Sequence, residues 1–144
     1  MDSTLAANAL TAPVATTSRG RLWTGRIVAG IVVAFMLFDA ILKLINPAGV
    51  QQAFARTGWP VHLSPVLGVI LLVSTILFIV PRTTILGALL LTGFLGGAVA
   101  TNVRLEEPLF SHTLFPVYFG ILLWGSLWLR DSRIAALIPL QKSR

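Results

Sequence analysis

"IVAGIVVAFMLFDAILKLINP", residues 27–47, decides the fold class of this chain. Residues 27–38 carry no charged side chain, and the apolar character continues to position 45 apart from one aspartate and one lysine. A helix of about 20 such residues crosses the hydrocarbon core of a bilayer. The asparagine and proline that follow stop a helix. We therefore predict a membrane-spanning helix over residues 22–45.

The composition of the whole chain also indicates a membrane protein. Of its 144 residues, 56% are hydrophobic and 11% are charged, against roughly 45–50% and 25% in soluble domains. Three more apolar stretches are long enough to span a bilayer, at about 64–80, 83–103 and 113–129. Helices satisfy their backbone hydrogen bonds internally, which open strands in lipid do not. The sequence thus predicts an all-α, integral membrane four-helix bundle over residues 21–134.

Local signals predict where these spans begin. Ser64 is placed to cap the second span, and Pro65 suits its first turn. Few residues separate the second span from the third, so these two should form a tight antiparallel hairpin. The fourth span begins either at Pro108, with Pro116 as a kink inside it, or near Thr113, with Pro116 in its first turn.

Basic residues near the helix ends predict the orientation. An even number of spans places both termini on one side of the membrane. That side carries eight basic residues and the other side three, and Lys and Arg concentrate on the cytoplasmic side. We therefore predict that both termini are cytoplasmic, and we assign the net charge of +6 to topology and anionic lipids, with no nucleic-acid partner. The eight are Arg19, Arg21, Arg26, Arg82, Arg130, Arg133, Lys142 and Arg144; the three are Lys43, Arg56 and Arg104.

The two ends of the chain differ from the spans. Residues 1–20 are rich in Ala, Thr and Ser and lack the basic start and apolar core of a signal peptide. We predict a disordered cytoplasmic tail there. Residues 135–144 are predicted to be a basic C-terminal tail, which either lies along the inner membrane surface or frays. The chain contains no cysteine, which excludes disulfides, thiol redox chemistry and thiolate metal sites.

Two charges stand near the end of the first span. Asp39 and Lys43 are four residues apart and so share one helix face. Inserting a charged side chain into the bilayer at the centre of a helix costs about 2.5 kcal/mol or more. The cost is smaller near the interface, where these two charges stand. Two interpretations remain open: a self-satisfied ion pair that anchors the helix end, or part of a binding site.

Further polar residues favour the binding-site interpretation. The third span ends on the same side with Asn102 and Arg104, and Glu106, Glu107 and His112 follow in the loop. These groups converge at one membrane depth. Our hypothesis is that, if the first span fills the groove on the third, Arg104 reaches down to Asp39 and frees Lys43 for a ligand.

A stripe of small residues leads up to Arg104 on the third span. Gly93, Gly97, Ala100 and Arg104 fall within about 60° of one another at 100° per residue. The two glycines form a GxxxG pair, which lets a neighbouring helix approach closely. We expect this face to pack inside the monomer, with homodimerisation as the alternative.

The motifs resemble those of a known family. "LFDAILKLINP" (37–47), "PRTTILGALLLTGFLGGAVATNVR" (81–104) and "PLFSHTLFPVYFGILLWGSLWLRD" (108–131) look like the bacterial DoxX-like family of four-span membrane proteins. The resemblance implies a fold and a location in the bacterial cytoplasmic membrane more than a reaction. The wider DoxX group takes its name from a membrane subunit of a thiosulfate:quinone oxidoreductase. Asn102 departs from the histidine that members often show, which weakens a haem or metal role there.

Two classes of function follow. The first is a structural or accessory membrane subunit without catalysis, whose polar cluster locks the bundle and docks a partner, either a membrane redox protein or a second copy of the chain. The alternative is a site for a quinone, a lipid or another small amphipathic molecule, because donors beside an apolar cleft suit such ligands. The predicted ligand-binding residues are Asp39, Lys43, Asn102, Arg104, His112 and Tyr118.

Other activities have weaker support in the sequence. A small transporter is a second alternative, but between the outer cluster and the cytoplasmic rim the chain offers only hydroxyl groups (Ser74, Thr75, Thr92 and Ser126), which make no relay of ionisable groups. We expect no catalytic residue and no metal site. The predicted function requires no cofactor. If the protein does bind one, we expect a quinone.

Overall fold

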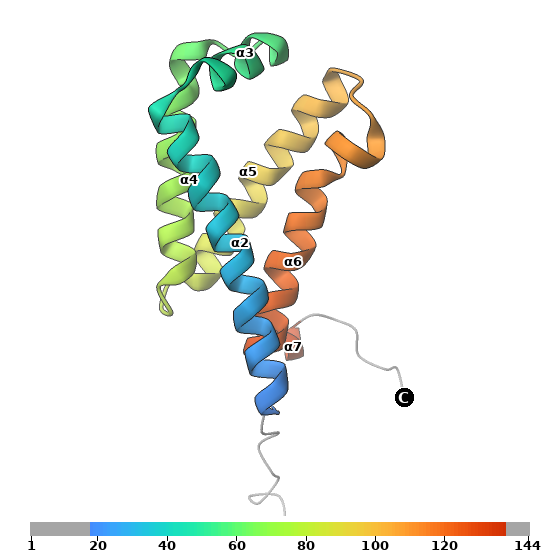
Figure 1. Cartoon of the computed structure of the whole chain (residues 1–144). Helices are drawn as coiled ribbons and strands as arrows, with labels where there is room; N and C mark the ends of the chain where they lie inside the picture. The colour runs from blue at the N-terminus through green and yellow to red at the C-terminus, as the bar shows by residue number, and fades with distance from the viewer. Residues whose placement is uncertain (1–17, 138–144) are drawn as a thin grey trace, which may run out of the picture.

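The computed structural model describes residues 18–137 and is helical throughout its regular elements. Four helices are long and apolar enough to cross a membrane (Figure 1), which confirms the predicted all-α four-helix architecture. The long helices are α2 (Arg19–Ile45), α4 (Ser64–Ile79), α5 (Thr84–Arg104) and α6 (Phe115–Arg130). The spanning lengths of α4 and α6 include the short helical turns before them, from Val61 and from Leu109. The short elements are α3 (Ala48–Thr57), α7 (Ser132–Leu137), the 3₁₀ turn η1 (Val61–Leu63) and the π-helical turn η2 (Leu109–Thr113).

The first span begins slightly earlier than predicted. The Ser18 hydroxyl accepts a hydrogen bond from the backbone N–H of Arg21 and caps α2, so residues 19–20, predicted as tail, are helical. Asn46 ends α2 in the left-handed conformation, with φ 52°, as expected of a stop signal. The rest of the predicted N-terminal tail and residues 138–144 of the predicted C-terminal tail lie outside the described residues.

Two predicted helix starts need comment. Ser64 does not cap α4: its hydroxyl donates to the Lys43 carbonyl of α2 at 3.0 Å and so joins two helices. For α6, the second of the two predicted starts is the nearer one, because the helix begins at Phe115 and Pro116 stands in its first turn. Proline is tolerated there because the first-turn N–H groups have no partner within the helix.

Helix α3 was not predicted; it lies between the first and second predicted spans. Pro47 precedes its first residue and Gly58 follows its last, with φ 71° at the glycine. Proline before a helix and left-handed glycine after it are ordinary helix-boundary signals. The sequence therefore contained signals for both ends of this helix. With 10 residues, however, the helix is too short to be predicted as a membrane span.

The four long helices form a ring in which α2 and α5 each pack on α4 and α6. Three glycines lie where helices approach most closely. A Cβ built on Gly25 would lie 2.6 Å from Cγ of Arg130, and one on Gly68 would lie 3.1 Å from the Ala40 carbonyl oxygen. Gly87 is tighter still, against the backbone of Phe78 in the α4–α5 hairpin. None of the three belongs to the predicted GxxxG pair.

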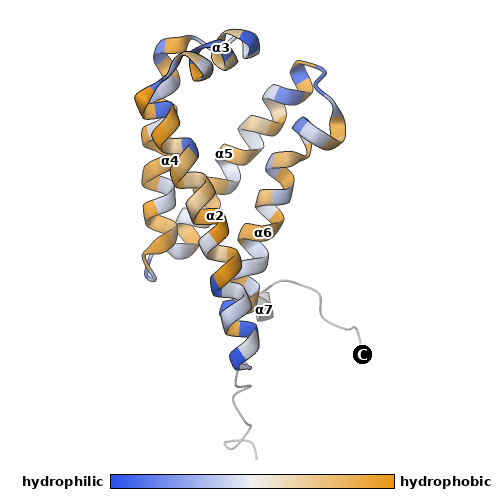
Figure 2. Ribbon diagram, in the orientation of Figure 1, coloured by the Kyte–Doolittle hydropathy of each residue, from blue (hydrophilic) through white to orange (hydrophobic). Residues whose placement is uncertain are grey.

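The outer surface of the bundle is apolar, as lipid requires. Large side chains such as Ile27, Ile31 and Ile121 are more than half exposed on the monomer, and hydrophobic residues cover most of the middle of the long helices (Figure 2). Water would disfavour so large an exposed apolar surface. Lipid tails do not, so the chain is a multi-pass membrane protein.

The bundle has two ends. The terminal end holds the start of α2, the α4–α5 turn and α7; the loop end holds α3 and η2 (Figure 1). Which end faces the cytoplasm stays a prediction from the basic residues.

Candidate functional site

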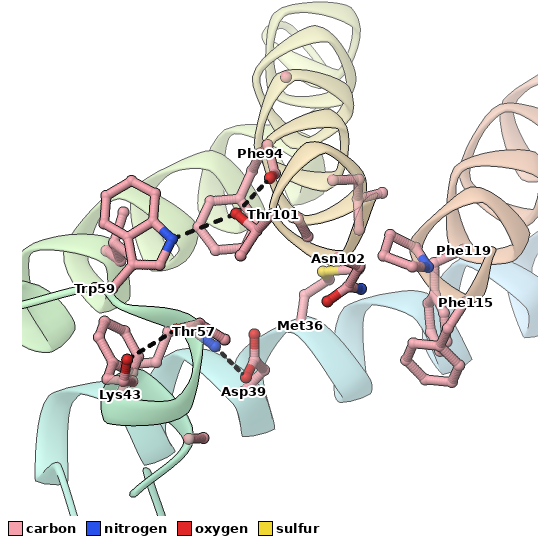
Figure 3. Close-up of a pocket in the computed structure, with 18 of the residues that line it drawn as sticks. Met36, Asp39, Lys43, Thr57, Trp59, Phe94, Thr101, Asn102, Phe115 and Phe119 are labelled. Carbon is pink, nitrogen blue, oxygen red and sulfur yellow. Dashed lines mark hydrogen bonds and ion pairs between the residues drawn. The ribbon is translucent and has the colours of Figure 1, made fainter. Parts of the chain in front are cut away.

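A cavity of about 440 Å³ opens at the loop end. Its walls come from α2, α5 and α6, and the lining is completed by α3, by Trp59 after it and by Leu67 of α4 (Figure 3). It lies between α2 and α5, the two helices that face each other diagonally across the ring.

The polar part of the cavity is the Asp39–Lys43 ion pair on α2. The ammonium group donates to the carboxylate one turn earlier, and the two side chains are 31% and 17% exposed for Asp39 and Lys43. The Lys43 nitrogen also lies 6.0 Å from the ring centre of Phe94 on α5, within cation–π range. The helix spacing predicted this pair, which gives each charge a partner of opposite sign one turn away.

The apolar part of the cavity is an aromatic cluster. Phe35 stacks on Phe119 with ring centres 4.2 Å apart, and Phe115 lies 5.6 Å from Phe35 and 5.1 Å from Phe119. Phe35 stands one turn before Asp39 on α2, so the aromatic wall and the carboxylate share a helix face. The cavity thus passes from aromatic to ionic within one helical turn.

Helix α3 is fastened over the cavity by contacts to the end of α5. The Trp59 indole donates to the Thr101 hydroxyl at 3.3 Å (Figure 3), and the Arg104 guanidinium donates to the Thr57 carbonyl. Phe54 of α3 is buried and lines the cavity. Helix α3 therefore covers the cavity and is held there by these hydrogen bonds to α5.

Arg104 therefore does not reach Asp39, and that prediction is wrong. The carbonyl of Thr57 at the end of α3 takes the guanidinium, and Lys43 stays paired with Asp39. A free helix C-terminus offers unsatisfied carbonyls, and α3, which was not predicted, brings one to Arg104.

The expected packing of the small stripe inside the monomer is also wrong. A Cβ built on Gly93 or Gly97 meets nothing within 4 Å among the described residues, and both glycines line the cavity. Ala100 is exposed and lies outside the lining. The two glycines leave room for the cavity, and no neighbouring helix of the described residues packs against them. Contact of this face with a second copy of the chain stays a prediction.

The six predicted site residues divide into two groups. Asp39, Lys43 and Asn102 line the cavity. Arg104, His112 and Tyr118 do not. Arg104 fastens α3, whereas His112 in η2 and Tyr118 in the first turn of α6 are exposed. Their contacts there are local, since the His112 ring pairs with the Ser111 hydroxyl at 2.8 Å, the Asn102 amide donates to the His112 carbonyl at 2.8 Å, and the Tyr118 hydroxyl donates to the Phe110 carbonyl at 3.3 Å.

The aromatic lining was missed because the prediction followed charges. Spacing alone carried a usable signal: Phe35, Asp39 and Lys43 recur every four residues, as do Phe115 and Phe119, which places each set on one helix face. The other missed lining residues are Met36, Ala53, Phe54, Thr57, Trp59, Leu67, Phe94, Leu95, Ala98, Thr101 and Pro116.

The fold and the cavity together define a class: a small multi-pass helical membrane protein with an amphipathic cavity at one end. Comparison with known families is more specific. The chain belongs to the DoxX-like family, whose model it matches over residues 27–126. No curated protein and no solved structure matches it.

Proposed function

We propose that this protein binds a small amphipathic molecule in the loop-end cavity, with a quinone head group as the best candidate. The observation that carries the proposal is the juxtaposition of the Phe35, Phe115 and Phe119 cluster with the Asp39–Lys43 pair in one cavity. Aromatic walls with a few placed polar groups are typical of small-molecule sites.

The volume limits the ligand. About 440 Å³ lies within the ~300–1,000 Å³ range of small-molecule pockets, so the cavity suits one substituted ring and not a whole phospholipid. An attached apolar tail would leave along the small residues of α5, Gly93 and Gly97, which line the cavity and are exposed.

The donors for the polar end of the ligand come from α2 and α5. The ammonium group of Lys43 has three N–H donors, and one of them donates to the Asp39 carboxylate. Asn102 holds its amide beside the cavity by donating to the His112 carbonyl, and its side-chain oxygen can accept a hydroxyl. A quinone carbonyl would accept from Lys43, and a quinol hydroxyl would donate to Asn102 or Asp39.

Filling the cavity from the α5 wall should remove binding. Gly97→Leu adds an isobutyl group to the lining, and its Cβ has open space, since nothing lies within 4 Å of a Cβ there. We expect retention of decylubiquinone by the detergent-purified full chain, measured by native mass spectrometry, to weaken roughly tenfold, which corresponds to about 1.4 kcal/mol.

Gly96→Leu is the matched control. Its position has the same open space but lies outside the cavity lining, so retention of the quinone should be unchanged. Equal retention in both variants, or no retention by the original chain, would contradict a quinone site in this cavity.

A structural or accessory subunit is the second candidate. It is favoured by one observation: the Asp39–Lys43 pair is already self-satisfied, as expected if it only anchors the helix end. In that role the cavity is a by-product of diverging helices, and unchanged quinone retention in Gly97→Leu is the result that supports it.

A further inference from the structure

A second cavity, of about 400 Å³, lies at the terminal end of the bundle. Three arginines from separate parts of the chain line it: Arg26 from α2, Arg82 from the α4–α5 turn and Arg130 from the end of α6. The three arginines are far apart in the sequence. They line one cavity because α2 and α6 pack together and the α4–α5 hairpin turns beside these two helices.

The positive charge in this cavity is poorly compensated. Asp131 is the one carboxylate in the lining, and its Oδ1 already accepts the backbone N–H of Arg133 at 2.8 Å. Within residues 18–134 the recorded ion pair is Asp39–Lys43, at the opposite end of the bundle. Three guanidinium groups therefore face one carboxylate, and the cavity attracts an anion.

Apart from the Thr84 hydroxyl, the rest of the lining is apolar, and it reaches the lipid-facing surface. Ile79 and Ile85, which flank Arg82 on either side of the hairpin turn, line the cavity and are 52% and 50% exposed. The apolar lining is completed by Leu22, Pro81, Leu127 and Ile134. A small soluble anion would make no contact with this apolar surface, whereas the acyl chain of a lipid would cover it.

We propose that this cavity binds the phosphate head group of an anionic phospholipid, whose acyl chains lie over Ile79 and Ile85. Guanidinium groups bind phosphate oxygens in pairs through their forked donors, and basic pockets between membrane helices bind anionic head groups. This site is independent of the quinone proposal, because the two cavities share no lining residue.

Arg82→Gln is the best test variant. Arg82 is exposed in the hairpin turn, so its loss leaves the helix packing intact, whereas Arg130 packs against Gly25. We expect native mass spectrometry of the full chain in detergent to show dioleoylphosphatidylglycerol retained in preference to dioleoylphosphatidylcholine, and Arg82→Gln to weaken that retention about fivefold.

Arg56→Gln is the matched control, since Arg56 is exposed on α3 and lines neither cavity. It should retain phosphatidylglycerol like the original chain. Equal retention of the two lipids, or equal loss in both variants, would overturn the proposal. Displacement of the lipid by millimolar inorganic phosphate would also overturn it, by identifying a site for free phosphate.

Discussion

Replacing Gly87 with alanine is expected to lower the free energy of unfolding of the bundle by about 3 kcal/mol, at the upper end of the usual cost of overpacking. An ideal Cβ at this position would lie 2.6 Å from the Leu77 carbonyl carbon and closer still to the backbone nitrogen of Phe78. Backbone atoms cannot rotate away as a side chain can. The α4–α5 hairpin must therefore open, and Phe78, which is 1% exposed, loses part of its packing.

The measurement is reversible unfolding in mixed detergent micelles, followed by circular dichroism. Gly96→Ala is the control, because nothing lies within 4 Å of a Cβ there and alanine is the better helix former by roughly 1 kcal/mol. It should be neutral or stabilising. A Gly87→Ala variant as stable as Gly96→Ala would show that the hairpin is not packed as described.

Removing Lys43 should have the second largest effect. Lys43→Ala leaves the Asp39 carboxylate without its cation inside a membrane-spanning helix. An unpaired acidic group in such a helix is unfavourable by up to about 3 kcal/mol, and partial exposure of Asp39, at 31%, reduces that figure. We expect a loss of about 2 kcal/mol in the same unfolding measurement.

The double variant Asp39→Ala, Lys43→Ala separates pairing from packing. Because neither charge remains, it should be more stable than Lys43→Ala alone, a coupling that a double-mutant cycle measures directly. Strictly additive losses from the two single variants would mean that the ion pair contributes nothing to the bundle.

The sequence predicted the parts of the fold that rest on local chemistry. Apolar length placed the four spans, the i, i+4 spacing paired Asp39 with Lys43, and Pro116 marked the first turn of α6. Each of these depends on a few neighbouring residues and on the bilayer as solvent. They hold whatever the helices pack against.

The parts that depend on which helix neighbours which could not be predicted. The GxxxG pair at Gly93 and Gly97 indicated close packing, yet α5 packs through Gly87 instead and turns the pair toward the cavity. Arg104 was expected at Asp39, and the carbonyl of Thr57 on α3 holds it instead. A stripe of small residues shows that a close approach is allowed, and only the tertiary arrangement decides whether one occurs.

Both proposed sites require four helices that cross the bilayer, and we predict that the aromatic cavity lies at the extracytoplasmic end. Because the chain has no cysteine, single cysteines report on this directly. Gln52 on α3 and Ser111 in η2 are exposed at the loop end, and Ser132 at the start of α7 is exposed at the terminal end.

The decisive measurement is labelling of intact expressing cells with a membrane-impermeant maleimide. We expect Gln52→Cys and Ser111→Cys to react in intact cells and Ser132→Cys to react only after lysis. Labelling of Ser132→Cys in intact cells, or of Gln52→Cys and Ser111→Cys on opposite sides of the membrane, would contradict this prediction.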